Sequence, residues 1–281
     1  MKQEEMAPTE LAKLTVPYSI PGVEAVTVRR DVPYRETESG SLGFDVYYPP
    51  GAVAGDRRPA VLIVYGYSDA GVPNVFGRSF KEMGQTISWA RLIAASGLTA
   101  IVYSNREPVD DVQSVLRHVR DHAASLGIDE TRLGLWAASG NVPLALWLVM
   151  QREWPEFRCA VFCCGFMLDL HGATAVADIQ KTYRFVNPCA GKSVDDVRDD
   201  LPLLIVRAGR DQFAGINDSI DGFISAALQR NLPIRLVNHA DAPHAFDLFH
   251  DGDATRELIR EILRFMQFHL VGPVLSDRLG V

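Results

Sequence analysis

The sequence lacks the features that direct a chain to a membrane, a nucleic acid or the secretory route. Among its 281 residues, no apolar run reaches the roughly 18 residues that a membrane-spanning helix needs. The N-terminal residues Met1–Met6 are polar and acidic, unlike the apolar stretch of a secretory signal. Acidic residues outnumber basic ones by 35 to 28, which disfavours nucleic acid or an anionic membrane as the main partner. We therefore expect a cytoplasmic protein without these partners.

Cysteine is also scarce, and its spacing suits neither a disulfide framework nor a zinc site. There is no Cys-x-x-Cys pair, and no histidine cluster has metal-ligand spacing. Three of the four cysteines fall in the apolar stretch 157–166, where small thiols pack well. We expect all four to be reduced and buried, and we expect no metal or organic cofactor. They are Cys159, Cys163, Cys164 and Cys189.

Apolar residues are plentiful by contrast. Hydrophobic residues make up 47% of the chain and charged residues 22%, enough apolar material for a large core. A chain of this length with alternating strands and helices is usually one domain, so we predict a single domain over residues 1–281. Residues 1–20, interrupted by prolines, are predicted to form an N-terminal arm on the surface.

Runs typical of buried strands alternate along the chain with segments of helical period. This alternation predicts βαβ units and an α/β fold with a mostly parallel sheet, in which the first two strands form an antiparallel hairpin. The strands are predicted at 26–34, 42–48, 59–65, 98–103, 133–137, 157–166, 203–206 and 234–237. The helices are predicted at 87–96, 110–126, 143–150, 220–228 and 258–270.

One interval, 168–200, has little periodicity and lies between two predicted strands. It is longer than most connections, which favours a short lid inserted over a site. An ordinary crossover helix with loops explains the same length, and the sequence does not separate these two readings.

The candidate for chemistry is Ser139, which lies between a predicted strand and a predicted helix. A serine on such a sharp turn is the arrangement of a nucleophile elbow, whose usual signature is Gly-x-Ser-x-Gly. Here Ala137 and Asn141 replace the two outer glycines, so the motif alone is incomplete. The alternative is a structural serine that caps the following helix.

A serine hydroxyl becomes a good nucleophile only beside a base, and that base needs a third group to orient it. Asp211 follows the predicted strand 203–206, and His244 follows the strand 234–237. Because parallel strands end at one edge of a sheet, we expect both side chains to lie near Ser139.

Other residues of the same types are weaker candidates. His239 competes with His244 as the base, whereas Asp241 and Asp247 compete with Asp211 without following a strand of their own. The remaining polar residues are given structural roles: Asn217 and Asp218 as the start of the helix 220–228, and His171, His250 and His269 as surface or core residues.

Three segments carry a resemblance to a known family: Gly127–Leu133 before the elbow, Ala208–Asp211, and Ala242–Phe246. With the order Ser, Asp, His, they make residues 25–270 similar to the α/β-hydrolase superfamily, nearest to dienelactone hydrolases and acetyl esterases. The last segment departs from the family's His-Gly-Phe ending, because Ala245 replaces the glycine.

The resemblance implies an α/β-hydrolase fold with helices on both faces of the sheet. It also implies that Ser139 is the nucleophile, Asp211 the orienting acid and His244 the base. Dienelactone hydrolases carry a cysteine at the nucleophile position, so Ser139 favours ordinary ester chemistry. The implied partner is a small-molecule ester substrate.

Ester hydrolysis also needs donors for the negative charge that develops on the carbonyl oxygen. We expect one from the backbone N–H of Gly140 and the other from Tyr67, through its backbone or its hydroxyl. Asn141, Tyr65 and Gly66 are expected to line the same pocket. For Tyr65, packing at the edge of the sheet is an open alternative.

The sequence thus predicts a serine hydrolase that cleaves esters of small to medium soluble substrates through an acyl-enzyme. An amidase or peptidase with the same three residues is one alternative. A non-catalytic binding protein of the same fold is another, motivated by Asn141 and Tyr65. The sequence allows a homo-oligomer without specifying one.

Overall fold

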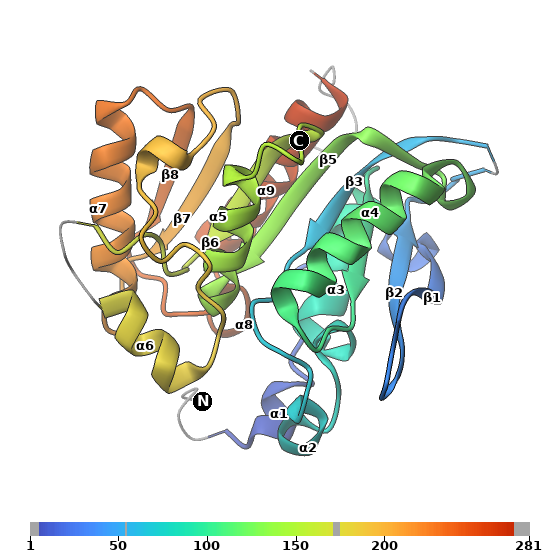
Figure 1. Ribbon diagram of the computed structural model, residues 1–281, viewed down its shortest axis with the longest axis horizontal. Coiled ribbons are helices and arrows are strands. Elements are labelled where there is room, and N and C mark those ends of the chain that lie inside the picture. The colour runs from blue at the N-terminus through green and yellow to red at the C-terminus, as the bar shows by residue number, and fades with distance from the viewer. Residues whose placement is uncertain (1–5, 54, 171–174, 273–281) are drawn as a thin grey trace. The chain divides into compact units, whose positions relative to one another are not determined.

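The strands expected from the apolar runs are present in the computed structural model, which describes residues 6–53, 55–170 and 175–272 (Figure 1). The chain divides into two compact units. Unit 1 comprises Met1–Ile63, Ser68–Gly134 and Gln267–Val281, and unit 2 comprises Val64–Tyr67 and Leu135–Met266.

Unit 1 contains the N-terminal hairpin and the first parallel strands. Its strand order is β1-β2-β4-β3-β5, and strand β5 continues into unit 2. The β1–β2 and β2–β4 pairs are antiparallel, whereas β3 and β4 are parallel, as the sequence predicts. The strands are β1 (Thr27–Thr37), β2 (Gly40–Tyr48), β3 (Arg58–Ile63), β4 (Thr99–Tyr103) and β5 (Ile128–Ala138).

The helices of unit 1 include two long ones, of which α3 packs on β2 and β4. Helix α4 ends at Gly127, whose φ of +64° suits a glycine after a helix. Short helical turns that the sequence did not predict lie near the N-terminus and after β3. The helical segments are α1 (Pro8–Leu11), η2 (Val23–Ala25), α2 (Val72–Phe76), η3 (Phe80–Glu82), α3 (Gly84–Ala95) and α4 (Pro108–Leu126).

In unit 2 the strand order is β5-β6-β7-β8. Its β6–β7 and β7–β8 pairs are parallel, so their carboxyl ends lie at the same edge. The strands are β6 (Phe157–Cys163), β7 (Leu203–Ala208) and β8 (Ile234–His239). The helical segments are η4 (Ser139–Asn141), α5 (Val142–Met150), α6 (Ala175–Tyr183), η5 (Val194–Asp196), α7 (Ile216–Gln229), α8 (Phe246–Phe249) and α9 (Asp253–Val271), the last of which ends in unit 1.

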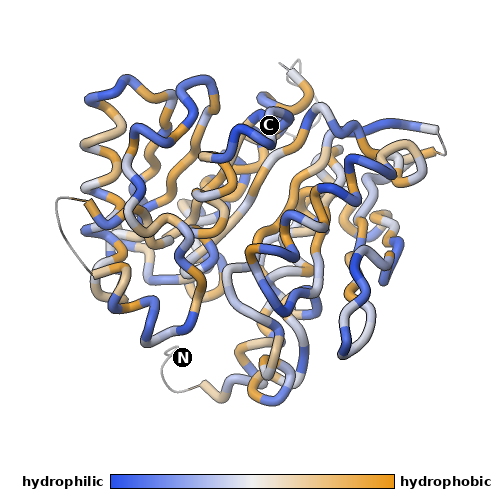
Figure 2. Tube along the Cα trace, viewed as in Figure 1, coloured by the Kyte–Doolittle hydropathy of each residue, from blue (hydrophilic) through white to orange (hydrophobic). Residues whose placement is uncertain are grey.

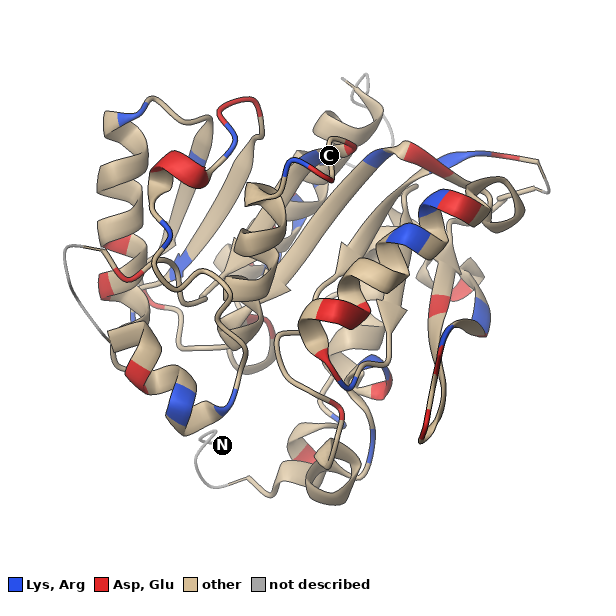
Figure 3. Cartoon of the chain, in the orientation of Figure 1, with Lys and Arg blue, Asp and Glu red and all other residues tan. Residues whose placement is uncertain are grey.

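Apolar strands supply the core of each unit. β4 is buried along its whole length, and β6 exposes one residue. Figure 2 shows hydrophobic residues along the strands, and Figure 3 shows charged residues gathered mainly on helices and loops. Continuous burial of this kind is expected for parallel strands covered on both faces.

Several boundaries differ from the prediction, and at two of them the backbone conformation gives the reason. Helix α7 begins at Ile216, because Gly215 adopts a φ of +83° directly before it. Asn217 therefore lies inside the first turn, where its side-chain amide donates a hydrogen bond to the Ala208 carbonyl (2.9 Å). Strand β6 ends at Cys163, because Cys164 adopts a φ of +45° and leaves the ladder.

All four cysteines are buried and free of disulfides, in agreement with the expected reduced core thiols. Burial raises the pKa of every one of them, to about 12 for Cys159, which keeps the thiols protonated. Within the described part of the chain, no helix is both long and apolar enough to cross a membrane.

Candidate active site

The turn after β5 places Ser139 in an unusual backbone conformation. Its φ is +57°, in the left-handed region that residues with a side chain seldom adopt. The neighbouring chain is packed closely, because a Cβ on Gly165 would collide with Val142 and lie 2.9 Å from the Ser139 carbonyl oxygen. Pro143 then stands in the first turn of α5, where its missing N–H is harmless. The incomplete elbow motif therefore still builds a sharp strand-to-helix turn.

Ser139, His244 and Asp211, all in unit 2, form a continuous chain of hydrogen bonds. His244 Nε2 lies 2.9 Å from Ser139 Oγ, and His244 Nδ1 lies 2.7 Å from Asp211 Oδ2. An ionised carboxylate can only accept, so Nδ1 carries the proton and Nε2 is left to accept one from the serine hydroxyl. The Asp211 side chain is fully buried, and its second oxygen accepts the backbone N–H of Phe213 (2.9 Å).

The loops that carry Asp211 and His244 are fixed against each other. A Cβ on Gly209 would collide with the Ala240 carbonyl, so only glycine allows this approach. The Arg210 N–H donates to the Ala242 carbonyl (2.8 Å). Ala245, at the position where the His-Gly-Phe motif has glycine, adopts a φ of +50°. The loop after β8 therefore keeps a glycine-like turn without the glycine.

The competing histidine lies in a different environment. His239 Nε2 is 3.0 Å from the Thr255 hydroxyl, which also lies 2.7 Å from His250 Nδ1. Burial, followed by the nearby His250, lowers the pKa of His239. The His239 side chain is thus bonded to Thr255, whereas His244 is the histidine beside Ser139.

The other candidate acids lie in different environments from Asp211. Asp241 is exposed and forms an ion pair with Arg210 (2.6 Å). Asp247 is buried in helix α8 and is not part of the Ser139–His244 hydrogen-bond chain. Asp218 is exposed in the first turn of α7. His171 lies outside the described residues.

Asn141, one of the two departures from the elbow motif, holds the loop after β3. Its Oδ1 accepts the backbone N–H of Gly66 at 2.8 Å. A Cβ on Gly66 would lie 2.6 Å from the Gly140 carbonyl oxygen and 3.1 Å from Asn141 Cα, so this loop rests directly on the elbow. An asparagine in place of the usual glycine therefore has a defined contact, which the sequence did not reveal.

The Tyr67 hydroxyl also lies against the turn after β5. A Cβ on Gly140 would collide with this hydroxyl, which therefore lies over the residue after Ser139. Burial raises the pKa of Tyr67 to about 12, although a hydrogen bond with the Ser139 side chain acts in the opposite direction. The hydroxyl is neutral at ordinary pH and can donate. Tyr65 is 3% exposed and packs in the core of unit 2.

Two aromatic residues at the site were not singled out from the sequence. Phe213 packs edge-to-face with His244, with ring centroids 4.5 Å apart. Phe185, from the interval 168–200, packs edge-to-face with Tyr67 at 5.9 Å. The aromatic character of Phe185 in a polar, weakly periodic interval was the only available signal.

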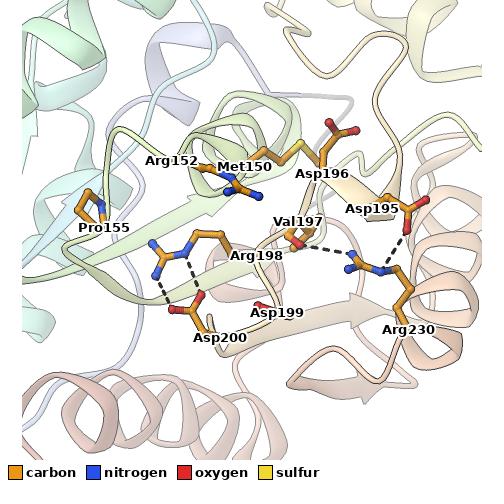
Figure 4. Close-up of a pocket in the computed structure, with 10 residues that line it drawn as sticks. All are labelled: Met150, Arg152, Pro155, Asp195, Asp196, Val197, Arg198, Asp199, Asp200 and Arg230. Carbon is orange, nitrogen blue, oxygen red and sulfur yellow. Dashed lines mark hydrogen bonds and ion pairs between the residues drawn. The ribbon is translucent and has the colours of Figure 1, made fainter.

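A separate pocket of about 430 Å³ lies elsewhere in unit 2 (Figure 4). Two of the arginines that line it are held by its own acids: Arg198 by Asp200 through two hydrogen bonds of 2.9 Å, and Arg230 by Asp195 at 3.1 Å. None of the predicted site residues lines it. Among the described residues, no group of three or more His, Cys, Asp or Glu side chains could hold a metal ion.

Comparisons with known proteins identify the fold. No family model matches the sequence, and no curated protein matches it. Among solved structures, the esterase Est2 of the Planctomycetes species Thermogutta terrifontis is 20% identical with a TM-score of 0.67, over 95% of this chain and 99% of that one. Esterase 2 of the same organism phosphorylated by paraoxon is 19% identical with a TM-score of 0.64, over 94% and 100%.

A second esterase, LipW from Mycobacterium marinum, is 17% identical with a TM-score of 0.64, over 86% of this chain and 81% of that one. At such low identity, the likeness establishes the fold alone. The chain therefore has the α/β-hydrolase fold that its sequence motifs predict, with an antiparallel hairpin leading a mostly parallel sheet.

Proposed function

We propose that this protein is a serine hydrolase that cleaves carboxylic esters through an acyl-enzyme on Ser139. The observation that carries the proposal is the chain of short hydrogen bonds from Asp211 through His244 to Ser139, at 2.7 and 2.9 Å. The esterases that share its fold, one of them phosphorylated by paraoxon, support the same class of chemistry. The nearer likeness to dienelactone hydrolases stays a prediction.

In the first half of the reaction, His244 Nε2 takes the proton of the Ser139 hydroxyl as Oγ attacks the ester carbonyl carbon. The imidazolium that forms is held by Asp211, whose carboxylate keeps the ring oriented. His244 then gives that proton to the departing alcohol oxygen, and the acyl group remains on Oγ. Water repeats the sequence in the second half, which releases the acid and restores Ser139.

The tetrahedral intermediate carries negative charge on the former carbonyl oxygen, so donors must already be in place. The Gly140 N–H stands at the beginning of α5, where the helix dipole favours negative charge. The Tyr67 hydroxyl supplies the second donor in this proposal, because it is neutral and lies over Gly140.

Labelling with a fluorophosphonate tests the proposal. We expect the probe to add covalently to Ser139, detected as a mass increase on the peptide that contains it, and to abolish hydrolysis of a short-chain aryl ester. Ser139→Ala should prevent both labelling and hydrolysis. Ser125→Ala, at an exposed serine of α4, is the control and should retain both.

Folded wild-type protein that is neither labelled nor active would contradict the proposal and favour a non-catalytic binding protein. A panel of matched esters and anilides then separates an esterase from an amidase, because anilides have the poorer leaving group. We expect the ester to be cleaved faster.

A further inference from the structure

A buried threonine of unit 2 joins the two ends of the segment that carries His244. Thr255 stands in the first turn of α9 and is 2% exposed. Its hydroxyl lies 3.0 Å from Nε2 of His239, the last residue of β8. The same hydroxyl lies 2.7 Å from Nδ1 of His250, which directly follows α8. His244 lies between these two histidines in the sequence, so one hydroxyl binds both ends of its segment.

The Thr255 hydroxyl also determines how the two imidazoles are bonded. It has a single proton, so it can donate to only one of the two ring nitrogens, and the other nitrogen must donate an N–H to it. The rings of His239 and His250 meet edge to face, with centroids 4.9 Å apart. The His250 ring also lies against Gly252, where a Cβ would be 3.0 Å from His250 Cε1. The orientations of both rings therefore depend on one buried oxygen.

The backbone of His239 connects this threonine to the loops of the proposed catalytic residues. The His239 carbonyl accepts two backbone N–H groups, one from each loop. Gly209, two residues before Asp211, donates at 2.8 Å. Ala242, two residues before His244, donates at 3.1 Å. A shift of the His239 backbone would therefore act on both loops at once.

The loop that carries His244 has little regular structure of its own. The His244 N–H donates to Oε1 of Gln212 at 3.2 Å, and Gln212 is exposed. Ala245 follows with its positive φ of +50°. No helix or strand ladder spans residues 240–245, all of which are described, so the position of His244 depends on how the two ends of its loop are held.

We propose that the Thr255 hydroxyl, with the two histidines bonded to it, positions His244 for proton transfer. We call these three residues, Thr255, His239 and His250, the Thr255 cluster. The inference rests on the proposed ester hydrolysis. The cluster is not part of the hydrogen-bond chain from Asp211 to Ser139, so it acts through the loop and not on the substrate. Such positioning matters because a displacement of about 1 Å can lower a rate about 100-fold.

Thr255→Val tests this in the full chain, because valine resembles threonine in shape and lacks its hydroxyl. Both ring nitrogens then lose a buried partner, and the histidines must shift to find another. With a short-chain aryl ester, we expect kcat to fall at least about tenfold. KM should stay within about twofold of wild type, because His244 acts in both halves of the reaction and both slow together.

Two variants separate positioning from a general loss of structure. Thr255→Ser restores the hydroxyl and should return kcat to near the wild-type value. Thr99→Val is the matched control, since Thr99 is fully buried in β4 and its hydroxyl has no hydrogen-bond partner among the described residues. This control should leave kcat and KM unchanged, and urea unfolding checks that every variant is folded in the assay.

A second pair of variants, at the half-buried His250, keeps the test decisive if Thr255→Val does not fold. His250→Leu removes Nδ1, whereas His250→Asn places a polar amide close to where Nδ1 stood. We expect kcat to fall in His250→Leu and to be largely retained in His250→Asn, with KM unchanged in both.

Failure of this inference is distinguishable from failure of the proposed function by fluorophosphonate labelling. If wild type is labelled and active, an unchanged kcat in folded Thr255→Val would overturn the positioning role. A loss that Thr255→Ser does not restore would overturn it too, as would equal kcat values for His250→Leu and His250→Asn. Folded wild type that is neither labelled nor active would remove the proposed function, and the inference with it.

Discussion

Two substitutions of Ser139, by glycine and by alanine, separate the effect of backbone strain in the turn from the effect of losing the hydroxyl. Both variants lose Oγ and its hydrogen bond to His244, but only alanine keeps a Cβ at a φ of +57°. A left-handed conformation costs a residue with a Cβ about 1–2 kcal/mol. Glycine gives back about 0.5–1 kcal/mol through the larger entropy of its unfolded chain. Ser139→Gly should therefore be more stable than Ser139→Ala by about 1 kcal/mol.

Urea unfolding of the two variants measures this difference, and equal m-values would establish that both unfold from equally compact states. Hydrolysis and fluorophosphonate labelling should be lost in both. If Ser139→Ala were as stable as Ser139→Gly, the strain from the positive φ would not exceed the entropy that glycine loses on folding, and the reasoning would be refuted. Retained hydrolysis in either variant would instead remove Ser139 from the reaction.

Four further changes test other parts of the site. Ala245→Gly should raise the free energy of unfolding by about 1 kcal/mol, because Ala245 also has a positive φ of +50°; lower stability in urea would contradict this. Asn141→Ala leaves the Gly66 N–H without its acceptor and should cost about 1–3 kcal/mol together with activity, whereas Asn141→Asp should retain most of both. Tyr67→Phe should lower kcat about 10²- to 10³-fold if its hydroxyl is a donor to the oxyanion, and an unchanged kcat would leave that role to its backbone. The pKa of His239 is lower in the folded protein than in the unfolded chain, so the unfolded chain binds the proton more readily. The free energy of unfolding should therefore decrease as the pH falls below about 6.5. His239→Gln should lose less stability than wild type between pH 8 and pH 5, and equal losses would exclude this contribution.

Much of the fold could be predicted because burial dictates the sequence of its strands. Continuous apolar runs such as those of β4 and β7 mark parallel strands covered on both faces, and the alternation with helices fixes the class. Helix α6 lies in the interval 168–200, for which the sequence left a lid and an ordinary crossover helix open, and its bounds were not predicted because it is short. The backbone N–H groups of Val176 and Ala177, near its start, donate hydrogen bonds to the carboxylate of Asp169 at 2.9 Å each. Asp169 lies several residues before the helix in the sequence.

The meeting of Ser139, Asp211 and His244 follows from the rule that parallel strands end at a common edge, and the structure brings the three within hydrogen-bond distance. Their catalytic roles remain predictions. Phe185 and Phe213 could not be found in the same way. Ring contacts depend on how distant segments pack, and an aromatic residue in a loop has no periodicity to indicate which neighbour it will meet.

The backbone strain also bears on the two readings of Ser139. A serine that served only as a turn residue could be replaced by glycine with a gain in stability, because the turn requires a positive φ. Ala245 has a similar φ of +50° without a reactive side chain, so the contacts of the Ser139 hydroxyl carry more weight than the strain. The Ser139 side chain points its Oγ at His244, and the histidine is in turn held by a fully buried carboxylate. Burying a carboxylate is costly unless it is paired, and here its partner is the imidazole itself. A serine joined to a buried acid through one histidine is the arrangement that the proposed nucleophilic role of Ser139 predicts, whereas a turn residue needs none of these contacts.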